Sequence, residues 1–118
     1  MQAFVDKTAQ VGENSKIGLG SVITGKVKIG KNCVIGNHVV IHPETEIGDN
    51  VRIDDHSVIG KLPLRAKQSK TTADKKLSPA KIGENCLIGT SAIIYAGANL
   101  GKGVLVADLA TVREDVTI

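Results

Sequence analysis

The sequence predicts an all-β solenoid in which short parallel strands coil around a narrow aliphatic core. Two patterns support this prediction: a branched aliphatic residue recurs at every sixth position, and glycine or asparagine recurs at fixed places between these residues. The aliphatic series runs from Val5 to Ile59 and resumes from Ile82 to Ile118, with ten and seven positions and no miss. A period of six fits neither an amphipathic helix nor a single alternating strand, so each unit of six combines a short strand with a corner.

The corners are predicted from the residues that stand between the aliphatic positions. Glycine directly follows the aliphatic residue at positions 12, 18, 30, 36, 48, 60, 83, 89 and 101. Two places further on stand Asn14, Asn32, Asn50 and Asn85, or Gly20, Gly97 and Gly103. Asparagine and glycine tolerate the left-handed backbone of a tight turn, so we expect a turn at each of these places.

We expect successive units to stack, because six residues cannot bury an aliphatic side chain alone. Three units per coil would form a triangular prism whose rungs lie about 4.8 Å apart. Hydrophobic residues make up 42% of the chain but aromatic residues only 2%, so Val, Ile, Leu and Ala must fill the interior. Such a composition suits a narrow and regular core.

The repeat itself resembles that of a known family. The segments IGKNCV at 29–34 and IGENCL at 82–87 are similar to the repeat of the bacterial hexapeptide-repeat acyltransferases, and the similarity covers nearly the whole chain. The resemblance implies a left-handed parallel β-helix with three strands per coil, although the general rule for crossover connections favours the right hand. It also implies an enzyme that transfers an acyl group from acetyl-CoA to an amino or hydroxyl group of a sugar nucleotide or a related metabolite.

One insertion interrupts the repeat of this single domain. Ile59 and Ile82 stand 23 positions apart where six would keep the frame, so we expect coils over 1–64 and 82–118 and an inserted loop at about 65–81. With the preceding Lys61 included, this stretch contains one acid, Asp74, and seven basic residues: Lys61, Arg65, Lys67, Lys70, Lys75, Lys76 and Lys81. Such a loop fits the phosphates of coenzyme A or of a sugar nucleotide, and we predict that Lys67, Lys70, Lys75 and Lys76 help to bind coenzyme A. The alternative is a solvated surface excursion.

The three histidines are the candidate catalytic residues. His38 and His56 occupy the same turn position one coil apart and should stack on one corner, and His42 is predicted to converge on the same edge. The resemblance implies a histidine that acts as general base on the attacking amine or hydroxyl, and His38 is our first choice. The alternative is that all three are polar surface residues at corners.

The outward position of one face is aliphatic and suggests an oligomer. It carries Val22, Val40 and Val58, followed by Ile93 and Thr111 if the insertion preserves the phase. The next face should carry Gln10, Lys28, Glu46, Leu64, Asn99 and Thr117. An aliphatic outer face favours a partner, and the resemblance implies a homotrimer. A monomer with scattered surface valines is the alternative.

The remaining features exclude several classes of protein. Cys33 and Cys86 share one inward position about two coils apart, too far for a disulfide, and no metal-type spacing is present, so we expect no metal. The net charge of +3 is mild and does not indicate a nucleic-acid surface. No apolar run is long enough to span a membrane, so we expect a cytoplasmic protein that binds small molecules.

Two further functions remain open at this stage. The aliphatic series ends at Ile118 without a capping segment and related transferases are longer, which favours a non-catalytic scaffold or oligomerisation module, or an inactive fragment of a longer transferase. A zinc-dependent γ-type carbonic anhydrase would use three histidines. The spacing of His38, His42 and His56 does not resemble that of its ligands, which makes this the weakest alternative.

Overall fold

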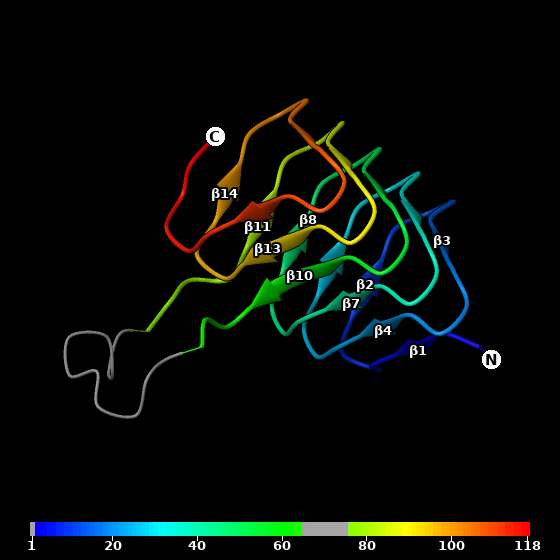
Figure 1. The fold of residues 1–118 in the computed structure, drawn as a ribbon. Coiled ribbons are helices and arrows are strands. Elements are labelled where there is room, and N and C mark those ends of the chain that lie inside the picture. The colour runs from blue at the N-terminus through cyan, green and yellow to red at the C-terminus, as the bar shows by residue number, and fades with distance from the viewer. Residues whose placement is uncertain (1, 65–75) are drawn as a thin grey trace.

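The computed structural model describes residues 2–64 and 76–118, and within these ranges the chain contains strands and turns but no helix. All the strand pairings are parallel, and they build three sheets that form the sides of one coil (Figure 1). The predicted all-β solenoid with three strands per coil is therefore confirmed. The chain completes about five coils in these residues.

Each sheet takes every third strand of the chain. Sheet A contains β1 (Phe4–Val5), β4 (Val22–Ile23), β7 (Val40–Ile41), β10 (Val58–Lys61), β13 (Ile93–Tyr95) and β16 (Thr111–Val112). Sheet B contains β2 (Gln10–Val11), β5 (Lys28–Ile29), β8 (Glu46–Ile47), β11 (Lys81–Ile82) and β14 (Asn99–Leu100). Sheet C contains β3 (Lys16–Ile17), β6 (Val34–Ile35), β9 (Arg52–Ile53), β12 (Leu87–Ile88) and β15 (Leu105–Val106).

A left-handed backbone closes the corners of the coil at the predicted turn position, except at Thr8 in the first unit. The angle φ is positive at Asn14, Asn32, Asn50 and Asn85, as expected from their residue type. The repeat imposes the same conformation on residues that do not favour it: Lys26, His38, Glu44, His56, Ser91, Leu109 and Asp115. A left-handed non-glycine residue costs about 1 kcal/mol or more, so the stacked core must stabilise these turns.

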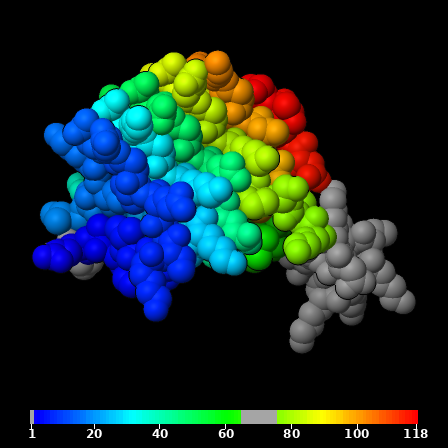
Figure 2. Space-filling model, turned by 180° about the vertical axis from the view of Figure 1, so that it is seen from behind, coloured from blue at the N-terminus to red at the C-terminus, as the bar shows by residue number. Residues whose placement is uncertain are grey.

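The core is a column of the recurring aliphatic residues. Ile23, Ile41, Ile59 and Ile94, which point inward from sheet A, are each 0% exposed. The short residues that precede the strands complete this interior, and among them Cys33 and Cys86 are buried free thiols. Figure 2 shows, from behind, that the coils follow one another along the molecule in chain order.

The insertion preserves the phase of the repeat, but its boundaries differ from the predicted 65–81. Val58 pairs with both Val40 and Ile93, so the predicted aliphatic column on sheet A is confirmed. On sheet B, Lys81 pairs with Glu46 and Asn99, whereas Leu64 is 86% exposed and belongs to no strand. The prediction of Leu64 in this column is therefore wrong.

The coil resumes at Ala80, which is fully buried, two residues before the predicted boundary at Ile82. In each complete unit, a small inward residue and then an outward residue precede the aliphatic residue. Ala80 and Lys81 fill these two positions before Ile82.

No helix among the described residues is long and apolar enough to cross a membrane.

Candidate functional site

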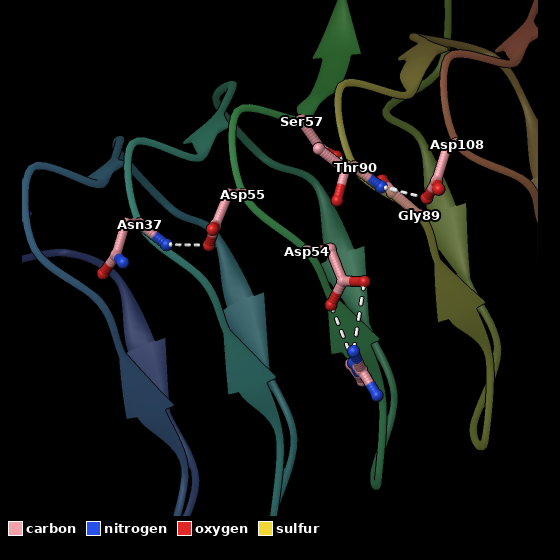
Figure 3. A network of polar contacts seen from close by, with 8 residues as sticks. Asn37, Asp54, Asp55, Ser57, Gly89, Thr90 and Asp108 are labelled. Atoms are coloured by element: carbon pink, nitrogen blue, oxygen red, sulfur yellow. Dashed lines mark hydrogen bonds and ion pairs between the residues drawn. The ribbon is translucent and has the colours of Figure 1, made fainter.

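Two of the three corners of the coil are built alike. Among the described strands, glycine follows all five of sheet B and three of the five of sheet C. A Cβ on Gly36 would collide with Oδ1 of Asp55 in the next coil. That oxygen instead accepts a 2.8 Å hydrogen bond from the backbone N–H of Asn37, and Asp108 accepts the equivalent 2.8 Å bond from Thr90 (Figure 3). Glycine at these corners makes room for bonds between coils.

The corner between sheets A and B departs from this pattern. The residues that follow the inward aliphatic residue of sheet A are, in coil order, Asp6, Thr24, His42, Gly60, Tyr95 and Arg113. Polar, charged or aromatic side chains thus stand where the other corners have glycine. We use the term A–B column for Asp6, Thr24, His42, Lys61, Tyr95 and Arg113.

A bulge brings Lys61 into this column in place of Gly60. The register of β10 shifts between Ile59 and Lys61, so that Lys61 pairs with Tyr95, and Gly60 has a φ of +84°. A Cβ on Gly60 would collide with Oγ1 of Thr45, so glycine is required here. β-bulges commonly lie next to active sites, where they redirect a side chain.

The bulge leaves one buried hydroxyl without a partner. In regular coils, Ser15 and Ser21 each donate a 2.7 Å hydrogen bond to the carbonyl oxygen of the glycine fifteen residues later. Thr45 stands in the same position relative to Gly60, but its Oγ1 is buried and forms no hydrogen bond. An unpaired buried hydroxyl costs about 1–3 kcal/mol, so the irregular backbone at Gly60 is destabilising.

An open cleft of about 540 Å³ lies beside the A–B column. The residues that line it include His42, directly after β7, Gly60, within β10, and Ala96, directly after β13. Lys76 and Leu77, from the described end of the insertion, form part of its wall. The cleft therefore lies where the insertion leaves and rejoins the coil.

His42 is the histidine of this cleft. Its side chain is partly buried, and this burial lowers the pKa of the imidazole below its ordinary value of about 6.5. The positive charge of Lys61 lowers the same pKa further. Both effects favour the neutral ring at neutral pH, and a neutral imidazole has a nitrogen that can accept a proton.

His38 and His56 form a separate pair. Their rings stack with centroids 5.4 Å apart and an interplanar angle of 11°, as the one-coil spacing predicts. Both residues are exposed and lie in turns before β7 and β10, whereas His42 follows β7. The prediction that all three histidines converge on one edge is wrong, because the whole of β7 separates the two corners.

The structure places only part of the predicted phosphate site. Lys76 lines the cleft with an exposed side chain, and Lys67, Lys70 and Lys75 lie outside the described residues. Within 2–64 and 76–118, no group of three or more His, Cys, Asp and Glu side chains could hold a metal ion.

Three residues of the A–B column that were not among the predicted site residues also lie together: Lys61, Tyr95 and Arg113. The side chain of Tyr95 is 7% exposed, and both cations lie against its ring, with Nζ of Lys61 at 5.3 Å and Cζ of Arg113 at 4.2 Å from the centroid. The available signal was that in every third unit, with the exception of Gly60, a residue other than glycine follows the aliphatic residue. Side chains that replace a structurally required glycine indicate a different role for that corner.

Comparisons with known proteins identify the family to which this repeat belongs. Residues 8–43 and 26–61 match the model described as bacterial transferase hexapeptide (six repeats), and residues 79–107 match the hexapeptide repeat of succinyl-transferase. The chain belongs to the hexapeptide-repeat acyltransferase family. The solenoid is therefore the left-handed parallel β-helix that the resemblance implied. A search of the curated proteins found no match to the sequence.

Solved structures with the same fold include several acyltransferases. UDP-N-acetylglucosamine acyltransferase from Campylobacter jejuni has a TM-score of 0.69 and 21% identity, over 88% of this chain and 48% of its own. The enzyme of the same name from Francisella novicida has a TM-score of 0.60 and 28% identity, over 98% and 45%. A mutant of AntD, an N-acyltransferase from Bacillus cereus in complex with dTDP and coenzyme A, has a TM-score of 0.62 and 21% identity, over 93% and 69%.

The chain spans about half the length of the first two of these structures. The similarity to these structures is one of fold and lies in the coiled β-helix. A fold alone does not determine a substrate, because function depends on the residues of the site.

Proposed function

We propose that the chain is the β-helix of an acyltransferase that transfers an acetyl group from acetyl-CoA to an amino or hydroxyl group of a sugar nucleotide. The observation that carries this proposal is the cleft lined by a partly buried histidine, His42, and by Lys76, with the charge of Lys61 acting on the histidine ring. Membership of the acyltransferase family supports the reaction class. The neighbours whose names include UDP-N-acetylglucosamine, dTDP and coenzyme A support the choice of substrates.

His42 would act as the general base of this reaction. Its neutral ring would take the proton of the acceptor amine or hydroxyl while the acceptor atom attacks the carbonyl carbon of the thioester. The new C–N or C–O bond would form, the C–S bond would break, and the proton would pass from His42 to the departing thiolate. Among the predicted catalytic residues, His42 is favoured over the exposed His38 and His56 because it alone lines the cleft.

The basic residues of the insertion would bind the phosphates of the donor. Lys76 already lines the cleft, and Lys67, Lys70 and Lys75 precede it in the chain. Exposed charges of this kind are screened over about 8 Å at physiological ionic strength, so affinity for coenzyme A should fall as salt is added. The cytoplasmic location expected from the sequence belongs to this proposal, since acetyl-CoA is an intracellular donor.

Isothermal titration calorimetry with acetyl-CoA tests the proposal, followed by a screen of amino-sugar nucleotides for thiol release. Saturable binding and release of coenzyme A with one acceptor would support the transferase. Failure to bind acetyl-CoA would favour the non-catalytic scaffold or the fragment of a longer enzyme. The binding step also stabilises the fold, so a rise in melting temperature with acetyl-CoA is a second readout.

We also propose that the chain forms a homotrimer through the outer face of sheet A, where Val22, Val40, Val58 and Ile93 form one aligned column. Sheet C offers a rival surface that the sequence analysis missed, since Leu87 is 46% and Leu105 is 68% exposed.

Light scattering of two variants distinguishes these surfaces. Val40→Lys should dissociate the trimer by placing like charges around its axis, and Leu87→Lys should leave it intact. A monomeric parent chain, or dissociation by Leu87→Lys alone, would contradict an interface on sheet A.

A further inference from the structure

Two cations lie on one buried aromatic ring in the A–B column. Lys61 belongs to the coil before Tyr95 and Arg113 to the coil after it, and both charged groups lie within 5.3 Å of the ring centre. The negative face of an aromatic ring attracts each cation and orients it. Since the ring is 7% exposed, Tyr95 is a fixed support for both side chains.

Carboxylates balance only one of the two charges. Arg113 pairs with Glu114, with Nε 2.9 Å from Oε1. Within the described part of the chain, no carboxylate forms an ion pair with Lys61. Like charges on the two coils that flank Tyr95 repel each other, and a bound anion would reduce this repulsion. A ligand that carries negative charge would therefore stabilise the arrangement.

The backbone supplies an independent reason to regard Lys61 as placed for a function. A regular coil would put Gly60 opposite Tyr95 and would pair the hydroxyl of Thr45 with the Gly60 carbonyl oxygen, as it does at the equivalent serines. The bulge instead puts Lys61 opposite Tyr95 and leaves Oγ1 of Thr45 unpaired in the core. Local irregularities that cost stability cluster at ligand sites.

We propose that Lys61 and Arg113, supported by Tyr95, bind the diphosphate group of a ligand that occupies the adjoining cleft. A diphosphate has the charge to match two cations, and the planar guanidinium can bind two of its oxygens at once. Gly60 and Ala96, the chain neighbours of Lys61 and Tyr95, line the cleft of His42, so the two sites adjoin. This inference deepens the proposed function, and it rests on that function for the identity of the ligand.

Titration calorimetry with inorganic pyrophosphate, using the whole chain, tests the site itself. Lys61→Gln and Arg113→Gln should each weaken binding about tenfold, because each removes a charged hydrogen bond. The matched control is Lys16→Gln, which removes the same charge from the exposed side chain of β3 on sheet C. Equal affinity in the parent and in both site variants, or an equal loss in Lys16→Gln, would overturn the proposal.

Glu114 provides a test with the opposite sign. It competes with an anion for Arg113, so Glu114→Gln should bind pyrophosphate more tightly than the parent chain does. Weaker binding by this variant would contradict the proposal, because removal of a neighbouring negative charge cannot weaken a diphosphate site that uses Arg113.

Two ligands in the proposed reaction carry a diphosphate, the nucleotide of the acceptor and coenzyme A. Titration of the parent and Lys61→Gln with dTDP and with coenzyme A identifies which one the site takes, because only that ligand should lose about tenfold in affinity. Unchanged affinity for both would overturn the assignment to a substrate. These measurements need no acyl transfer, so an inactive chain can still confirm the site, and an active chain can still refute it.

Discussion

The six-residue unit occurs in two versions. A regular version forms the corner between sheets C and A, and an irregular version forms the corner between sheets A and B. At the first, Gly36 admits the carboxylate of Asp55, and Ser57 donates a 2.7 Å hydrogen bond to the carbonyl oxygen of Gly89 (Figure 3). At the second, charged and aromatic side chains replace glycine, and the hydroxyl of Thr45 forms no hydrogen bond. The regular unit thus satisfies its own polar groups, whereas the departure at Gly60 leaves a buried hydroxyl unpaired and lowers stability.

The histidines illustrate the same difference. His38 and His56 follow the repeat, stack on each other and remain exposed at the regular corner. His42 interrupts the repeat, is partly buried, and lies beside a cation and a cleft. Residue type alone does not separate these two environments, but the corner on which each histidine lies does.

The largest expected effect comes from adding a side chain at the regular corner. Gly36→Val should reduce the free energy of unfolding by about 3 kcal/mol, because its Cβ would overlap Asp55 and force the coils apart. The matched change at the irregular corner, His42→Gly, should cost only about 1 kcal/mol, the entropic cost of glycine. Urea denaturation of both variants measures the difference, and equal losses would remove the distinction between the corners.

Removal of two buried hydroxyls should change the free energy of unfolding by smaller amounts and in opposite directions. Ser57→Ala should destabilise the fold by about 2 kcal/mol, because the carbonyl oxygen of Gly89 and the N–H of Ala92 both lose their partner. Thr45→Val should stabilise it by about 1 kcal/mol, because it removes a hydroxyl that has no hydrogen bond. Denaturation midpoints report both changes. Destabilisation by Thr45→Val would show that its hydroxyl has a partner.

The smallest effect concerns the protonation of His42. Lys61→Gln should raise the pKa of His42 toward its ordinary value, because one of the two causes of its depression is removed. A titration of the imidazole signals by NMR measures this, with Lys16→Gln as the control. An unchanged pKa in Lys61→Gln would mean that the ammonium group does not act on the ring.

The same depressed pKa sets the sign of a pH effect on stability. The folded chain binds a proton at His42 less readily than the unfolded chain, whose histidine titrates near 6.5. This residue therefore contributes its full stability above that pH and loses it as the pH falls below. His42→Gln should flatten the acid side of the stability profile as the pH falls below about 6.5, and chemical denaturation of both chains across this range measures the difference.

The regular part of the fold could be predicted from the sequence because each unit repeats the same local requirements. The aliphatic period located the core, and the asparagines and glycines located the left-handed turns. The position of Lys81 was missed because the length of an insertion does not show where its extra residues lie. Only the need for a small inward residue, supplied by Ala80, fixes the point at which the coil resumes.

The site was harder to predict because its key features are departures that look like ordinary members of the repeat. Gly60 occupies the same place as the other glycines, and nothing local shows that it forms a bulge that inserts Lys61. Strands of two residues also hide which corner a side chain belongs to. His38 and His42 are therefore close in sequence but lie at opposite ends of β7.

In the proposed function, the corner between sheets A and B performs the chemistry and the other corners build the coil. Steady-state acyl transfer by His42→Ala, His38→Ala and His56→Ala tests this division, once circular dichroism shows that each variant is folded. We expect a loss of about a hundredfold or more in kcat for His42→Ala alone, the contribution expected of a general base. Full activity of His42→Ala, or a comparable loss in His38→Ala or His56→Ala, would contradict it.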